Sequence, residues 1–118
     1  IDNSFTTTKK LKVGPWYNEP AGNPFSCCQL DKVATEFACQ GLELDMPIVC
    51  WGEDLQWSNS AWKRFERQSN CKDPHRLRSN CYRVLLTRGR DGFVVYVPGC
   101  ESLNETYEIL KKAGLKEI

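Results

Sequence analysis

Hydrophobic and polar positions divide the chain into short apolar runs that are separated by turn-forming and charged segments. Residues 32–35 and 46–51 have the length and composition of strands, and the second run ends at Gly52. Residues 93–97 are nearly continuous in β-branched and aromatic side chains, which predicts a strand covered on both faces. Between the first two strands, residues 37–41 are expected to form a loop or a helical turn.

A helix is predicted to begin at Asp73, because Asp is a good capping residue and the following Pro74 suits the first helical position. Apolar side chains then recur at helical spacing, so one face of this helix should pack on the sheet and carry an arginine at its end. The residues of that face are Leu77, Cys81, Val84, Leu85 and Arg88.

A second helix is predicted to open at a capping box formed by Ser102 and Glu105 and to end at Gly114. Strands that alternate with helices indicate an α/β layered domain with a mainly parallel sheet. Turn-forming Gly and Pro residues make residues 1–31 an irregular N-terminal segment, expected to pack on a domain of residues 32–118. The polar residues 53–72 look like an insertion within that domain.

The seven cysteines are an odd number, and several lie in apolar segments, which argues against a secreted disulfide framework. We therefore expect reduced, mostly buried thiols and a cytoplasmic, intracellular protein. Cys71 and His75 have a metal-ligand spacing but lack a second pair, so no metal site is expected. No apolar run approaches the roughly 20 residues of a membrane span, so no membrane partner is expected. The chain begins at Ile1, which indicates processing or excision from a longer protein.

The formal net charge of +1 hides a basic block. Residues 63–90 carry a net +7, whereas residues 1–62 carry −4 and residues 91–118 carry −2. Such a block suits a surface that faces nucleic-acid phosphates, although a solvated charged face would have the same composition. Trp57 and Trp62 could stack on unpaired bases or be buried. The candidates for phosphate contact are Lys63, Arg64, Arg67, Lys72, Arg76 and Arg78.

Two segments carry the candidate chemistry. Residues 34–45 fit the pattern T-x-x-x-x-[QK]-G-L-E-[FL]-D, and residues 82–90 place an apolar-apolar-Thr-Arg pattern at the end of the predicted helix. A guanidinium such as that of Arg88 could stabilise the charge that develops in phosphoryl transfer, although the helix dipole alone also favours arginine there. Gly41 permits close backbone approach to a ligand, and Glu43 could accept a hydrogen bond from a ribose hydroxyl. Local turns and capping are the structural alternatives for both.

In this order the two segments resemble motifs V and VI of superfamily 1 helicases. Residues 16–98 resemble the C-terminal part of an uncharacterised DNA/RNA helicase-like family that is related to the ATPase region of Schlafen proteins. Three words carry the resemblance: residues 33–45, the word Trp51-Gly52-x-Asp54-Leu55, and residues 80–89. The resemblance is specific, because all three words occur in the family's order.

The resemblance implies a three-layer RecA-like half-domain of the P-loop NTPase type, acting as the second motor domain of a helicase or nucleic-acid-dependent ATPase. Gln40, Gly41 and Glu43 would bind the nucleotide, and Arg88 would be the catalytic arginine finger. Thr35 would lie near a nucleic-acid phosphate, and the basic block adds candidates for DNA or RNA binding. Those candidates are Arg64, Arg67 and Arg76.

The sequence contains neither a G-x-x-x-x-G-K-[ST] loop nor an apolar strand ending in Asp-Glu. ATP and Mg²⁺ would therefore bind only in the intact parent, together with its N-terminal RecA-like domain, and this fragment alone should hold no cofactor and be inactive. Glu36-Phe37 replaces the residue-His pair of many helicases, which puts nucleic-acid contact there in doubt. The alternative function is an ATP-independent nucleic-acid-binding or protein-interaction module. DNA versus RNA, translocation polarity and duplex unwinding are not indicated by any motif.

Overall fold

The computed structural model describes residues 11–65 and 72–118 and divides the chain into two compact units, Ile1–Leu42 and Glu43–Ile118. Its described residues form a mixed α/β structure with one parallel and one antiparallel sheet, each of two strands. This confirms the α/β class and a parallel strand pair. The first unit holds helix α1 (Val13–Asn18) and the 3₁₀ turn η2 (Cys27–Gln29). Both are short, as the many Gly and Pro residues of this segment predict.

The predicted strand at residues 32–35 is wrong. This stretch has no ladder partner among the described residues and leads directly into a turn at residues 36–41. Thr35 opens that turn, because its carbonyl oxygen accepts a hydrogen bond from the Cys39 amide at 3.1 Å and its hydroxyl oxygen accepts one from the Ala38 amide at 3.3 Å. The expected turn at residues 37–41 is confirmed.

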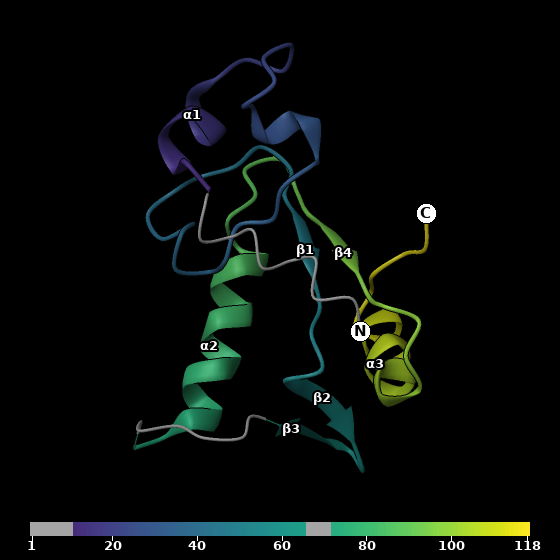
Figure 1. Ribbon diagram of the computed structural model, residues 1–118. Coiled ribbons are helices and arrows are strands. Elements are labelled where there is room, and N and C mark those ends of the chain that lie inside the picture. Colours follow the sequence, from purple (N-terminus) through teal and green to yellow (C-terminus); the bar gives the residue numbers. More distant parts are fainter. Residues whose placement is uncertain (1–10, 66–71) are drawn as a thin grey trace. The chain divides into compact units, whose positions relative to one another are not determined.

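The second unit is built on strands β1 (Ile48–Cys50) and β4 (Val94–Tyr96), which pair in parallel with Ile48 opposite Val94. Parallel strands need a long crossover, and helix α2 (Pro74–Leu86) lies between them in the chain. Figure 1 shows α2 and α3 (Asn104–Lys112) on opposite sides of this strand pair in that view. A second sheet, made of β2 (Leu55–Ser58) and β3 (Ala61–Arg64), precedes α2 in the chain.

Helix α2 begins as predicted, with Pro74 at its start and the Asp73 carboxylate accepting a hydrogen bond from the Arg76 amide at 3.0 Å. The predicted buried face is wrong. Leu77 and Val84 are 53% and 42% exposed, whereas Tyr82 is only 7% exposed. The helix therefore packs through an aromatic residue whose hydroxyl finds partners, rather than through its aliphatic stripe.

The core of the second unit joins strands, turns and both helices. Trp51, Leu55, Tyr82 and Leu103 are its buried members, and Leu103 belongs to the 3₁₀ turn η3 (Glu101–Leu103) that leads into α3. Trp51 and Tyr82 stack with ring centroids 4.3 Å apart. The half-buried apolar side chains packed against this core are those of Trp62, Leu86, Val95, Val97, Cys100 and Leu110.

Two further expectations for the C-terminal third are wrong. Ser102 lies within η3 and does not cap α3; its hydroxyl instead donates a hydrogen bond to the Glu53 carboxylate at 3.0 Å. Tyr96 is 58% exposed, so β4 is not covered on both of its faces. Helix α3 ends at Lys112, and Gly114, the predicted stop, follows two residues later with a left-handed φ of +110° that favours glycine.

None of the cysteines that the structure describes is in a disulfide, but the expectation of mostly buried thiols is wrong. Only Cys39 is buried; the others are half-buried or exposed, and Cys71 lies outside the described residues. Burial, and then the neighbouring Cys28, raise the pKa of the Cys27 thiol, which disfavours a reactive thiolate there. None of the described helices is both long and apolar enough to cross a bilayer.

An isolated parallel bridge joins Leu44 to Gly89 before β1 and β4 begin, one residue out of register with their ladder. The Arg90 amide donates a hydrogen bond to the Leu44 carbonyl at 2.7 Å. A Cβ atom on Gly89 would overlap the Gly92 carbonyl oxygen and lie 2.9 Å from Pro47 Cδ. Because the nearest obstruction is the backbone of Gly92, any side chain at Gly89 would distort the turn of residues 89–92 that directly follows the bridge.

We predict that Gly89→Ala destabilises the protein by about 1–3 kcal/mol, the usual cost of overpacking a site that cannot relax. Gly99→Ala is the matched control, because a Cβ atom there meets nothing within 4 Å. The free energy of unfolding in urea should stay within about 0.5 kcal/mol of the wild-type value for this control. Equal stability of the two variants would show that the close approach at Gly89 does not constrain the fold.

Candidate nucleotide-binding segment

Arg88 lies directly after the end of α2, not on the buried face of the helix as predicted. Thr87 ends the helix, and its hydroxyl donates to the Arg83 and Val84 carbonyls, both at 3.0 Å. The Arg88 amide then donates to the Leu85 carbonyl at 3.3 Å, and its carbonyl accepts from the Leu44 amide at 3.0 Å. Both backbone polar groups of Arg88 are thus fixed, and its side chain is half-buried.

The bridge brings the end of the first motif beside the end of the second. Since Leu44 faces Gly89, Glu43 and Arg88 occupy neighbouring positions one residue before it, and Asp45 and Arg90 one residue after it. An Arg90 guanidinium nitrogen lies 3.8 Å from the nearer Asp45 oxygen. These side chains are 64% and 77% exposed, so the pair contributes little to stability. Two carboxylates therefore accompany two arginines at this edge.

The other predicted nucleotide-binding residues, Gln40 and Gly41, lie in the turn that closes the first unit. Gly41 has a left-handed φ of +78°, a conformation that favours glycine, and Gln40 is exposed. Thr35, the predicted phosphate contact, begins the same turn and uses its hydroxyl to cap it. The structure thus groups Thr35, Gln40 and Gly41 in one unit and Glu43 and Arg88 in the other.

Helix α2 is held in place by the Tyr82 hydroxyl, which forms two hydrogen bonds. It donates to Asp54 Oδ1 at 2.7 Å and accepts from the Gly52 amide at 2.9 Å. The other Asp54 oxygen lies 3.1 Å from Arg78 Nε, one turn earlier on the same helix. Two side chains of α2, those of Tyr82 and Arg78, therefore contact the Asp54 carboxylate in the loop between β1 and β2.

Burial and the hydrogen bond to Asp54 raise the pKa of the Tyr82 hydroxyl above its ordinary value of 10.0. The hydroxyl therefore remains a proton donor at neutral pH. Gly52 is needed for this geometry, since a Cβ atom there would lie 2.5 Å from Asp54 Oδ1 and 3.3 Å from the Tyr82 oxygen. Because the Tyr82 hydroxyl is buried and bonded to both Asp54 and the Gly52 amide, this network stabilises the position of α2.

Asp54 and Tyr82 have no predicted role from the sequence, although both belong to the words that carry the family resemblance. The structure joins the second word to the third through the hydrogen bond from the Tyr82 hydroxyl to Asp54. The bridge from Leu44 to Gly89 joins the first word to the third in the same way. The signal in the sequence was the pairing of a Gly-x-Asp loop with a tyrosine in the middle of a helix.

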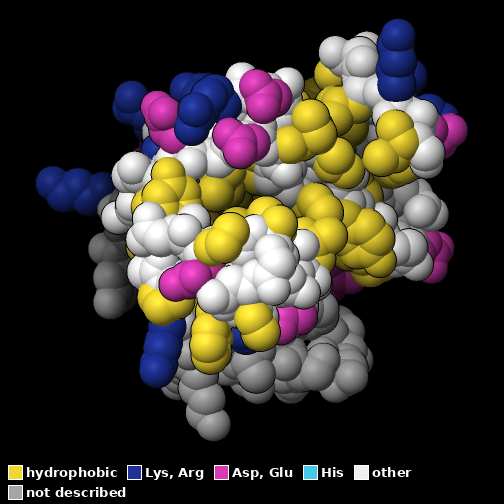
Figure 2. Space-filling model, turned by 90° about the horizontal axis from the view of Figure 1, so that it is seen from above, with side chains coloured by type: hydrophobic (Ala, Val, Ile, Leu, Met, Phe, Trp, Pro, Cys, Tyr) yellow, Lys and Arg dark blue, Asp and Glu magenta, His cyan; other side chains and the backbone are white. Residues whose placement is uncertain are grey.

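The basic block is only partly available for phosphates. Arg78 is paired with Asp54, which corrects its assignment as a phosphate contact, and Arg64 is half-buried on β3 opposite Leu55. Arg76 is exposed in the first turn of α2, and Arg67 lies outside the described residues. On the face drawn in Figure 2, Lys and Arg side chains are dispersed among acidic and hydrophobic ones.

Within residues 11–65 and 72–118, no group of three His, Cys, Asp or Glu side chains is placed to hold a metal ion. The pair of Cys71 and His75 is untested, because Cys71 lies outside this range. The chemistry available at the bridge is therefore that of fixed backbone groups, carboxylates and guanidinium groups. Such an arrangement can orient a polyanionic ligand and stabilise negative charge that develops on it.

Comparison with known proteins identifies the family of the chain. Residues 2–99 match the model of a family described as Schlafen group 3, DNA/RNA helicase domain. No curated protein and no solved structure matches the chain. The match covers most of the 118 residues, including the bridge and the whole of α2. The chain therefore belongs to the Schlafen group 3 DNA/RNA helicase domain family.

Proposed function

We propose that this chain supplies the second RecA-like motor domain of a nucleic-acid-dependent ATPase, with residues 34–45 and 82–90 acting as motifs V and VI. The observation that carries the proposal is the bridge between Leu44 and Gly89, which places Glu43 beside Arg88. Support for a RecA-like sheet comes from the parallel pair of β1 and β4 with α2 between them in the chain. Membership of a helicase-domain family agrees with both points.

In this proposal Arg88 is an arginine finger for a nucleotide bound mainly by another domain. Its backbone is fixed on both sides, by Leu85 and by Leu44, so the guanidinium needs little reorganisation to meet a phosphate. Glu43 would accept a hydrogen bond from the ribose, and the family resemblance implies that Gln40 and Gly41 also bind the nucleotide. ATP and Mg²⁺ would be held chiefly by the N-terminal RecA-like domain of the parent, and the isolated chain would not hydrolyse ATP.

In the intact parent protein, we predict that Arg88→Ala lowers kcat for ATP hydrolysis by roughly 10³ while nucleotide affinity changes little, because a finger acts mainly on the transition state. Arg90→Ala is the matched control: it lies on the same bridge but is exposed and paired with Asp45. It should retain turnover within a few-fold. Similar kcat values for the two variants would assign Arg88 to structure alone.

Nucleic-acid binding through the basic block is the second part of the proposal. With Arg78 committed to Asp54, the remaining described candidates are Lys63, Arg64, Lys72 and Arg76. Thr35 and Arg67 are further proposed contacts. Such contacts are to phosphates, so binding of DNA or RNA should be weak and indifferent to sequence.

We predict that the affinity for a single-stranded oligonucleotide falls with salt with a log–log slope of about −3 if four cations engage the backbone. Changing Arg64 and Arg76 together to Ala should reduce this slope by about 1.4, since each contact contributes about 0.7. Changing Lys112 and Lys116 removes the same charge elsewhere and should leave the slope unaltered. The slopes are measured by titration at several salt concentrations. An equal change of slope in both double variants would show that the basic block acts only through the general charge of the protein.

A further inference from the structure

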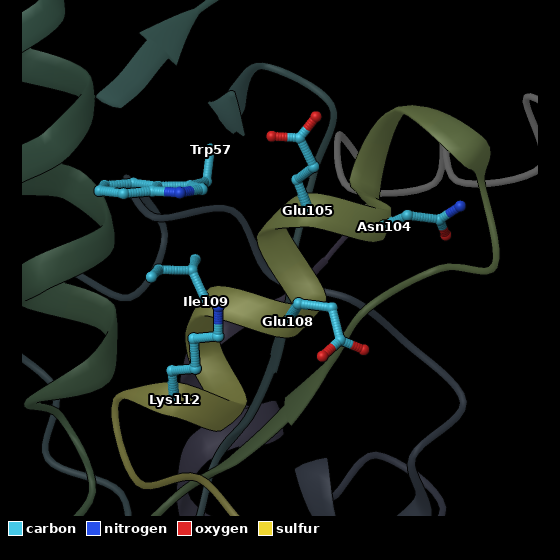
Figure 3. Close-up of a pocket in the computed structure, with 6 residues that line it drawn as sticks. All are labelled: Trp57, Asn104, Glu105, Glu108, Ile109 and Lys112. Atoms are coloured by element: carbon cyan, nitrogen blue, oxygen red, sulfur yellow. The ribbon is translucent and has the colours of Figure 1, made fainter. Parts of the chain in front are cut away.

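Two features of the described residues have no part in the proposed function: a groove beside α3 and a pair of adjacent cysteines. The groove lies between Trp57 and α3 and is lined by Glu105 and Glu108 but also by Lys112. Figure 3 shows the Glu108 carboxylate directed away from the Trp57 indole. Because acidic and basic groups share its lining, the groove selects no class of ligand. The cysteine pair, in contrast, has a defined chemistry.

Cys27 and Cys28 are the first two residues of the 3₁₀ turn η2, which lies wholly within the first unit. Neither is in a disulfide, and the two thiols are hydrogen-bonded to each other. The Cys28 side chain is exposed, whereas that of Cys27 is half-buried. The turn thus presents one accessible sulfur with a second thiol directly beside it, which is the arrangement of an attacking and a resolving cysteine.

A disulfide between these neighbouring residues would be strained. Consecutive Cα atoms lie about 3.8 Å apart, whereas disulfides usually join Cα atoms that are roughly 4.4–6.8 Å apart. Successive side chains of a 3₁₀ turn also point about 120° apart around its axis, because the turn has about three residues. Such strain makes a disulfide easy to reduce, and this is the property of regulatory rather than structural disulfides.

The ring closed by this disulfide would contain the peptide group that holds η2 together. The carbonyl of that group, from Cys27, accepts a hydrogen bond from the Leu30 amide at 3.2 Å. Its amide, from Cys28, donates to the Ser26 hydroxyl oxygen at 3.2 Å. Since the two sulfurs can bond only if this peptide group turns, oxidation would break both hydrogen bonds. Leu30 has a left-handed φ of 55°, which is unfavourable for a residue with a side chain, so the opened turn would not hold this conformation.

We propose that Cys27 and Cys28 form a redox switch, which hydrogen peroxide closes to a vicinal disulfide and a small thiol such as glutathione reopens. The Cys28 sulfur, after losing its proton, attacks one peroxide oxygen. An S–O bond forms, the O–O bond breaks, and the leaving hydroxide takes up the proton as water. The Cys27 sulfur then attacks the sulfenic acid on Cys28. The S–S bond forms, the S–O bond breaks, and the hydroxide leaves as a second water with the Cys27 proton.

The two steps balance. Two thiols lose two protons and two electrons, and one peroxide is reduced to two waters. In the reverse direction, two molecules of glutathione return both protons and both electrons and leave as their own disulfide. The oxidised turn lacks the hydrogen bonds of η2, so the redox state of the pair sets the structure of this segment.

The test treats the reduced full chain with hydrogen peroxide, blocks the remaining thiols with N-ethylmaleimide and digests the protein with trypsin. Cleavage after Lys12 and Lys32 releases residues 13–32, in which Cys27 and Cys28 are the only cysteines. We expect this peptide to lose two hydrogens and to carry no maleimide, and to accept two maleimide groups again after treatment with glutathione. In the oxidised chain, the Leu30 amide should exchange with solvent roughly five- to tenfold faster, because it loses its hydrogen bond.

Cys28→Ser should abolish the loss of hydrogens and leave Cys27 open to maleimide. Cys50→Ser is the matched control, because Cys50 is also exposed but lies outside the first unit, and it should leave the oxidation of residues 13–32 unchanged. Full maleimide labelling of the peptide after peroxide treatment, a cross-link to Cys39 in place of the ring, or resistance to glutathione would each overturn the proposal.

Equal exchange of the Leu30 amide in the reduced and oxidised chains would also overturn it, because the disulfide would then leave η2 unchanged. None of these readouts requires nucleotide or Arg88. The redox switch is therefore tested separately from the proposed role in ATP hydrolysis.

Discussion

The hydrogen bond from Tyr82 to Asp54 is the interaction on which the arrangement of the second unit depends. Helix α2 presents several of its aliphatic residues to solvent, so apolar burial along its predicted stripe does not fix its position. The Tyr82 hydroxyl and the Arg78 guanidinium instead hold the loop that follows β1, while the Tyr82 ring stacks on Trp51. A buried polar group with both partners in place sets one orientation of the helix more sharply than apolar contact alone.

The hydrogen bond from Tyr82 to Asp54 also determines where the C-terminal end of α2, and with it Arg88, lies. Because α2 is fixed near its middle, its last turn and Thr87 place Arg88 at the edge of the β1–β4 pair. There the Arg88 carbonyl accepts a hydrogen bond from the Leu44 amide. Gly89 leaves room for the Gly92 carbonyl in the turn that follows the bridge. The proposed catalytic role of Arg88 therefore depends on three features near it in the chain. They are the buried Tyr82, the helix end capped by Thr87, and Gly89, where a side chain would clash.

Local signals in the sequence predicted local structure well. Asp73 and Pro74 indicated the start of α2, and the β-branched run indicated β4, because both depend on neighbouring residues. The strand expected at residues 32–35 failed because a strand needs a partner that its own composition does not reveal. Ser102 fits a capping box by spacing but bonds Glu53, which lies far away in the sequence. For the candidate site, the sequence identified Glu43 and Arg88, whereas the role of Tyr82 depends on a contact across 28 residues.

The central claim is that the Tyr82 hydroxyl, rather than the ring alone, anchors α2. The most direct measurement compares the urea unfolding free energies of Tyr82→Phe and Tyr96→Phe. Both variants remove one hydroxyl, but Tyr96 is 58% exposed and Tyr82 is buried. The account predicts a loss of about 1–3 kcal/mol for Tyr82→Phe, because Asp54 and the Gly52 amide each lose a partner, and a change within about 0.5 kcal/mol for Tyr96→Phe. Equal stabilities of the two variants would contradict it.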